Sequence, residues 1–120
     1  MANSREQEAL RSYGLSLPDA TEDHPWGESV LKVNGKVFAF LGHGEDDGVG
    51  CGLKLPVSSE EALQWPGSKP SGYGLGRAGW VNVVFHPGDE IPWERLKAWV
   101  RESWRAVAPK RLVKAHPELA

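Results

Sequence analysis

The dipeptide Asn34-Gly35 constrains the fold of this chain more than any other short feature, because it separates two β-rich runs, residues 29–33 and 36–41. Both residue types accept the positive φ angles of a two-residue turn, so the pair predicts a β-hairpin. Such a turn places Val33 opposite Lys36 and Leu31 opposite Phe38. We therefore expect one face of the hairpin to join the core through Leu31, Val33, Phe38 and Phe40, and the other face to carry Lys32, Val37 and Ala39.

Two further segments have the composition of strands. Residues 49–55 place Cys51, Leu53 and Leu55 on one side, and residues 80–85 alternate apolar with other side chains. A weaker strand is predicted within residues 73–77. The polar stretch 21–27 predicts a loop.

Helices are expected at both ends of the chain. Residues 4–13 carry an apolar stripe that Gly14 can end, and residues 92–107 keep a 3.6-residue stripe up to Pro109. A short helix is predicted from Ser58, which has capping-box spacing to Glu61.

This element order predicts a two-layer α+β fold, in which the N- and C-terminal helices cover one face of an antiparallel sheet of about five strands. The length of 120 residues suits a single domain spanning 1–120. We expect a core at about 4–108 and a loose C-terminal tail at 109–120.

Charge is distributed unevenly along the chain. Residues 1–61 hold 5 Lys/Arg against 11 Asp/Glu, whereas residues 95–120 hold 7 against 2. A basic C-terminal end can approach phosphate backbones although the net charge is −2. The alternative is that these side chains are solvated and complement a helix dipole. No apolar run is long enough to cross a membrane and no signal peptide is recognisable, so we expect a cytoplasmic protein.

Three patterns resemble chemical motifs, and each also has a structural explanation. Gly74, Gly76 and Gly79 match G-x-G-x-x-G, but a strand follows where a nucleotide-binding loop needs a helix, so we interpret the match as a turn. His24 and His43 lie near carboxylates without the spacing of a metal motif. Cys51 is the only cysteine and is expected to be a buried small residue. The sequence therefore predicts no metal, no cofactor and no catalytic group.

Six tryptophans offer rings for base stacking or for the core. Trp99 and Trp104 lie on the apolar stripe of the last helix, so we expect both in the core. The remaining candidates for stacking are Trp26, Trp65, Trp80 and Trp93.

The order of several short motifs resembles the MmcQ/YjbR-like family. They are Leu17-Pro18, Thr21-Glu22, Pro25-Trp26-Gly27, the hairpin of residues 32–39, Gly52-Leu53-Lys54-Leu55, Pro66-Gly67, Gly72-Tyr73 and Trp80, together covering about residues 5–107. The resemblance implies a CyaY-like (frataxin-like) fold and DNA binding without enzymatic activity. Between Tyr73 and Trp80 this chain keeps only Arg77 of the polar side chains that the family commonly carries.

The resemblance and the cations together favour a non-enzymatic, nucleic-acid-binding accessory protein that contacts phosphates weakly and salt-dependently. The candidate binding residues are Lys32, Lys36, Lys54, Lys69, Tyr73, Arg77, Trp80, Asn82, Lys97, Arg101 and Arg105. The alternative is a small-molecule or protein-interaction module whose exposed sheet face forms a pocket. An enzyme of unassigned reaction is the third interpretation.

Overall fold

The computed structural model describes residues 5–25, 29–41, 49–72, 78–86 and 88–119. The helices are α1 (Arg5–Leu15), α2 (Ser59–Ala62), α3 (Trp93–Val107), α4 (Lys110–Ala115) and the 3-10 turn η3 (Pro117–Leu119). The strands are β1 (Ala20–Asp23), β2 (Val30–Val33), β3 (Lys36–Leu41), β4 (Val49–Lys54), β5 (Lys69–Pro70) and β6 (Trp80–Phe85).

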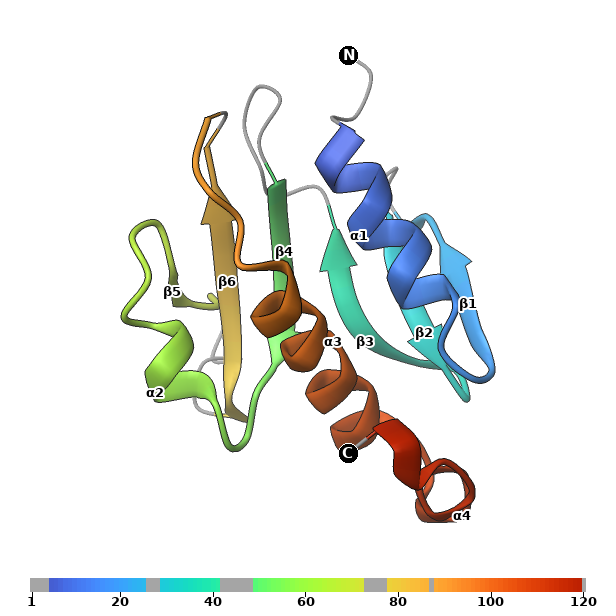
Figure 1. Ribbon diagram of the computed structural model, residues 1–120. Coiled ribbons are helices and arrows are strands. Elements are labelled where there is room, and N and C mark those ends of the chain that lie inside the picture. Colours follow the sequence, from blue (N-terminus) through green and yellow to red (C-terminus); the bar gives the residue numbers. More distant parts are fainter. Residues whose placement is uncertain (1–4, 26–28, 42–48, 73–77, 87, 120) are drawn as a thin grey trace.

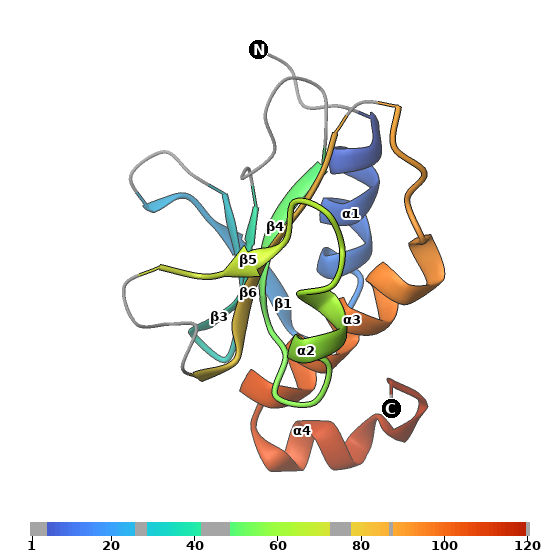
Figure 2. The same cartoon turned by 90° about the vertical axis from the view of Figure 1, so that its left-hand side faces the viewer.

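The strands form one six-stranded sheet in the order β1-β2-β3-β4-β6-β5, and each neighbouring pair is antiparallel. Helix α3 packs on β3 and β4, and α1 packs beside it on β1 and β4 (Figure 1). Figure 2 shows the sheet nearly edge-on, with the helices on one side of it. The predicted two-layer α+β architecture is therefore confirmed.

Two short strands that were not expected, β1 and β5, join the four expected strands that the structure describes and make six. The loop predicted at residues 21–27 is wrong for its first part, because Ala20–Asp23 pairs with the whole of β2. Asp19, with a φ of 58°, turns the chain into this strand. Polar residues form a strand here because β2 supplies the backbone partners. At the other edge, Lys69–Pro70 pairs with β6, and the strand predicted within residues 73–77 lies outside the described residues.

The hairpin forms at Asn34-Gly35, with φ angles of 53° and 78°, but its predicted register is only partly right. Val33 lies opposite Lys36 as expected, whereas Leu31 lies opposite Ala39 and not Phe38. An irregularity between Leu31 and Lys32 leaves Phe38 as an extra residue on β3, which is a β-bulge. The bulge reverses the alternation beyond it.

As a consequence, Ala39 faces the core and Phe40 faces away from it, which is the opposite of the expectation. The pairs Ala39–Leu53 and Phe40–Gly52 fix these two directions. Phe40 instead meets Trp80 on the helix-free face, with ring centroids 5.2 Å apart.

The core lies between the sheet and α3. Trp99 and Trp104 are 2% and 0% exposed, which confirms their predicted place. The Trp104 indole also donates a hydrogen bond to the carbonyl oxygen of Pro18, at 3.0 Å. Leu96 and Val100 of α3 are buried beside the two rings, and burial of such side chains is the main favourable term in folding.

Buried polar groups attach both helices to the central strands. Gln7 of α1 donates to the carbonyl oxygen of Gly50 and accepts from its N–H, at 3.1 and 2.9 Å. Ser103 of α3 accepts from the Lys54 N–H at 2.8 Å and donates to the Phe38 carbonyl at 2.5 Å. The Phe38 carbonyl, set free by the bulge, thus has a partner, as a buried polar group requires.

Helix α2 is capped by another helix and not by its own sequence. Ser58 makes no side-chain capping bond to α2. The Glu102 carboxylate of α3 accepts from the N–H groups of Val57 and Ser58, at 2.8 and 3.0 Å, and from the Ser58 hydroxyl at 2.6 Å. The predicted capping box is therefore wrong: the Ser58 N–H donates to Glu102 where a capping box would use Glu61, and the Ser58 hydroxyl also donates to Glu102.

The C-terminal end is folded, so the expectation of a loose tail is wrong for residues 110–119. Leu112 of α4 is 8% exposed and belongs to the core cluster. The His116 ring lies edge-on to Trp104, 6.3 Å between centroids. Pro109 separates α3 from α4, and the chain after it stays packed on the core.

Candidate functional site

The predicted binding residues do not form one surface. Lys54, Lys69, Trp80 and Asn82 share the helix-free face of the sheet, because Lys54 pairs with Trp80 and Lys69 pairs with Asn82. Lys32 has the same orientation, as predicted for it and Lys54. Lys97, Arg101 and Arg105 lie on α3, on the opposite side of the sheet. Tyr73 and Arg77 lie outside the described residues.

On the helix-free face, several of the polar groups have partners. The Lys32 ammonium is 2.8 Å from a carboxylate oxygen of Asp23. Asn82 accepts a hydrogen bond from the Ser71 hydroxyl at 2.8 Å. Trp80 is 8% exposed, so its ring offers little surface for stacking on a base. Lys54 and Lys69 are the cations of this face that make no ion pair among the described residues.

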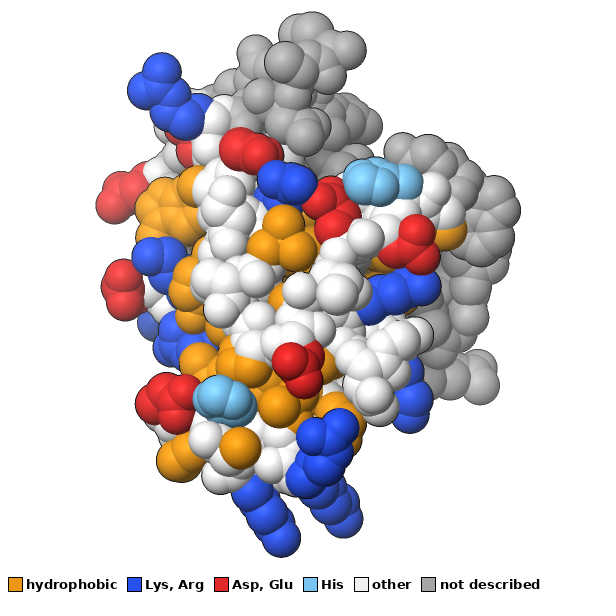
Figure 3. All heavy atoms as spheres, turned by 90° about the vertical axis from the view of Figure 1, so that its right-hand side faces the viewer, with side chains coloured by type: hydrophobic (Ala, Val, Ile, Leu, Met, Phe, Trp, Pro, Cys, Tyr) orange, Lys and Arg blue, Asp and Glu red, His pale blue; other side chains and the backbone are white. Residues whose placement is uncertain are grey.

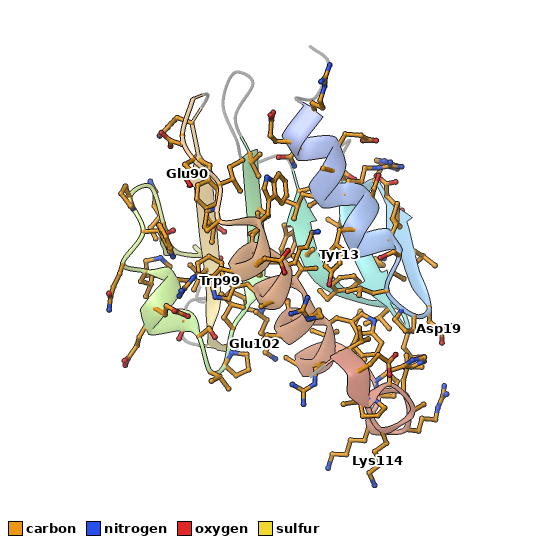
Figure 4. The ribbon with its side chains drawn as sticks, viewed as in Figure 1. Tyr13, Asp19, Glu90, Trp99, Glu102 and Lys114 are labelled. Carbon is orange, nitrogen blue, oxygen red and sulfur yellow. The ribbon has the colours of Figure 1, made fainter. Side chains whose placement is uncertain are left out.

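On α3, Lys97 and Arg101 turn toward α1. The Lys97 ammonium lies 5.5 Å from the centre of the Tyr13 ring, and Arg101 donates to the Tyr13 hydroxyl at 2.9 Å. Figure 4 shows Tyr13 at the junction of α1 and α3. Both contacts leave the positive charge uncompensated, since a phenol ring and hydroxyl carry no formal charge. Two of the predicted cations thus also stabilise the packing of α3 against α1.

The strongest concentration of free positive charge lies beyond them, at the end of α3 and along α4. Arg105, Lys110, Arg111 and Lys114 are exposed, and none makes an ion pair within the described ranges. We call these four residues the basic end. In Figure 3, Lys and Arg side chains project from the lower end, whereas acidic and basic side chains are interspersed elsewhere on that face. Figure 4 shows Lys114 pointing away from the rest of the molecule.

Three of these residues, Lys110, Arg111 and Lys114, were missed as candidates because residues 109–120 were expected to be loose. The excess of 7 basic over 2 acidic residues in 95–120 was the signal that could have found them. Lys36, the remaining candidate, is exposed at the start of β3, and β3 begins at the same end of the molecule as α4 (Figure 1).

A hollow of about 240 Å³ lies between α3, η3 and the turn before α2. It is lined by Val57, Ala98, Arg101, Glu102, Arg105 and Leu119. Two predicted cations, Arg101 and Arg105, therefore meet apolar side chains in one concavity.

A second ionic cluster joins α1 to β1. Arg11 donates to both oxygens of Glu22, at 2.5 to 3.0 Å, and Ser29 donates to the same carboxylate. The hydrogen bonds from Arg11, assisted by Ser29, lower the pKa of Glu22 to about 2. His24 Nε2 lies 3.2 Å from the carboxylate, on the exposed side. The chain uses this cluster to hold a helix on the sheet edge.

The remaining motifs have structural roles where they are described. Cys51 is buried, as predicted, and this burial raises the pKa of its thiol to about 12. Gly79 adopts a φ of 90° immediately before β6, which is a turn leading into a strand. Gly74, Gly76, His43 and Trp26 lie outside the described residues. Within those residues, no three potential metal ligands cluster, and none of the helices has the length and apolarity to cross a membrane.

A family model described as YjbR matches residues 15–106. The chain belongs to the YjbR family. The YjbR match confirms the resemblance seen in the short motifs. It begins at the last residue of α1 and ends within α3, so α4 and most of the basic end lie beyond the matched YjbR region.

One solved structure supports the fold. A protein from Pseudomonas syringae, determined as a crystal structure in a structural genomics programme, superposes with a TM-score of 0.65 at 19% sequence identity. The match covers 84% of this YjbR chain and 97% of that protein, and at this identity it concerns the fold alone. A search of curated proteins finds no match.

Proposed function

We propose that this YjbR-family protein is a non-enzymatic accessory protein that binds nucleic acid weakly through the basic end. The observation that carries the proposal is the group Arg105, Lys110, Arg111 and Lys114, which is exposed and without carboxylate partners among the described residues. Phosphate contacts of this kind supply affinity without reading sequence. The proposal includes no catalytic step and no cofactor.

The spacing of these four cations supports contacts with successive phosphates along a nucleic-acid strand. Arg105 lies in the last turn of α3, and Lys110, Arg111 and Lys114 follow on α4 after the bend at Pro109. Because α3 and α4 meet at an angle, the four cations spread over a wider surface than they would along one side of a single helix. Lys110 and Lys114 are four residues apart and so share one side of α4.

The direct test is fluorescence anisotropy of a labelled duplex, with salt raised from about 50 to 200 mM. We expect micromolar binding at low salt that weakens steeply as salt rises. The triple variant Lys110→Gln, Arg111→Gln, Lys114→Gln should bind at least about 10-fold more weakly and flatten the salt dependence, because each phosphate contact contributes a slope of about 0.9.

The matched control removes the same charge from the other face, through Lys32→Gln, Lys54→Gln and Lys69→Gln. We expect it to change binding by less than about 2-fold, through net charge alone. Equal losses in both triple variants, or no binding by the unaltered protein at low salt, would refute the proposal.

The second candidate function is a ligand-binding module on the helix-free face. The gathering of Lys54, Lys69 and Asn82 beside the Phe40–Trp80 pair favours it. A thermal-shift screen of metabolites would test it: a ligand whose stabilising effect is lost in the sheet-face triple variant and kept in the α4 triple variant would assign ligand binding to this face.

A further inference from the structure

We propose that the hollow between α3 and η3 is a binding site for a small carboxylate with a short apolar tail. The site is distinct from the phosphate-tracking surface of the basic end, although Arg105 belongs to both. It does not need the α4 cations Lys110, Arg111 and Lys114, which do not line the hollow.

The charges of the hollow favour an anion. Glu102 is its only carboxylate among the lining residues, and both of its oxygens accept hydrogen bonds from Val57 and Ser58. These donors fix the carboxylate toward the turn before α2. Arg101 and Arg105 form no ion pair with it. Two guanidinium groups therefore face one carboxylate that is already engaged, which leaves an excess of positive charge in the hollow.

The donor chemistry selects a planar anion. Arg101 uses one N–H group on the neutral Tyr13 hydroxyl, a contact that positions the side chain and leaves further donors available. Arg105 is exposed and makes no ion pair among the described residues, which leaves its guanidinium donors available. A guanidinium group binds a carboxylate through two parallel hydrogen bonds, which gives geometric selection as well as affinity.

The remaining walls favour an apolar tail. Val57 is 84% exposed, the largest exposure of any large apolar residue described, and it lines the hollow together with Ala98 and Leu119. A phosphate ion is strongly hydrated and would gain nothing from these three side chains. A volume of about 240 Å³ is below that of pockets for drug-sized ligands and suits a molecule of a few carbons.

The test is a titration with isovalerate, followed by amide chemical shifts of the full-length protein. We expect shifts at residues 57, 98, 101–105 and 119, with a Kd on the order of 1 mM. The isosteric neutral amide, isovaleramide, should bind at least about 10-fold more weakly, because it lacks the charge that the guanidinium groups recognise. Inorganic phosphate should also bind more weakly than isovalerate.

Variants separate the two halves of the site. Arg101→Gln should weaken isovalerate binding about 10-fold, whereas Lys54→Gln, which removes the same charge from the helix-free face outside the hollow, should leave it unchanged. Val57→Ser should weaken isovalerate but not acetate, since only the tail contact is lost. The same spectra show whether each variant is folded.

Several results would overturn the proposal: equal binding of isovaleramide, phosphate as tight as isovalerate, equal losses in the Arg101 and Lys54 variants, or no shifts at about 20 mM ligand. The α4 triple variant keeps this site apart from the proposed function. It should lose DNA binding and retain isovalerate, so failure of either proposal is visible while the other stands.

Discussion

Glu22 shows how a single residue can bind a helix to the edge of a sheet. Its side chain is 13% exposed and accepts from Arg11 and Ser29. Glu22 was predicted to lie in a polar loop, and its partner comes from a helix eleven residues earlier. A sequence shows that both charges exist, but only the path of β1 brings them together.

The lowered pKa of Glu22 predicts an acid limb in the stability profile. Because the folded-state pKa of about 2 is below the usual value of 4.5, the ionised form stabilises the fold. That contribution is complete above about pH 5 and is lost as the pH falls toward about 2, where the unfolded state binds more protons. Urea unfolding at several pH values should show this loss.

Glu22→Gln should remove most of the acid limb and cost about 1–3 kcal/mol of unfolding free energy at pH 7. Glu8→Gln is the matched control, because Glu8 also binds Arg11 but is 51% exposed. We expect less than about 0.5 kcal/mol from this control. A Glu22→Gln protein with an unchanged acid limb would contradict the assignment.

At the scale of elements, two glycines with positive φ should respond differently to the same change. Gly67, with a φ of 87°, lies in the turn between α2 and β5, and a Cβ there would lie 2.8 Å from the carbonyl oxygen of Val84. Gly35, with a φ of 78°, has open space around it in the hairpin turn. Both positions are strained for alanine, but only Gly67 adds a backbone clash.

Gly67→Ala should therefore destabilise the protein by more than about 2 kcal/mol, and Gly35→Ala by about 1 kcal/mol. The difference between the two urea midpoints, at equal slope, measures the cost of the close approach to β6. Equal destabilisation would mean that backbone strain alone accounts for both.

The elements also show where inference from sequence stops. The hairpin and the α3 stripe follow from local chemistry, so Asn34-Gly35 and Trp99 were predicted correctly. The bulge at Phe38 was not, because the residue that satisfies the carbonyl freed by the bulge is distant in sequence: Ser103 of α3 donates to it. The cap of α2 failed for the same reason, since Glu102 lies 44 residues away from Ser58.

For the whole molecule, the question is whether the C-terminal end unfolds together with the core. Leu112 is 8% exposed and belongs to the core cluster, so α4 should be part of one cooperative unit. Leu112→Ala should then lower the unfolding free energy by about 2–3 kcal/mol.

Thermal and urea unfolding, followed by tryptophan fluorescence and circular dichroism, would check this prediction. Lys114→Ala on the exposed side of α4 is the control and should change stability by less than about 0.5 kcal/mol. Unchanged stability in Leu112→Ala would mean that α4 frays independently of the core.

The same element explains why the candidate site was predicted only in part. Arg101 and Arg105 were identified from the helical spacing of α3. The hollow that they share with Val57 and Leu119 depends on how η3 folds back, which no local pattern encodes. The hollow could not be predicted because it depends on packing between segments that are distant in the sequence, and not on the chemistry of single residues.

The outermost strand β5 has a consequence for how these molecules behave at high concentration. It has two residues, and one of them, Pro70, has no N–H to offer a seventh strand. A short edge with a proline and an exposed lysine is a poor template for edge-to-edge pairing between copies. Among the described strands, this edge of the sheet therefore offers little free backbone for the open-ended pairing between copies that leads to aggregation.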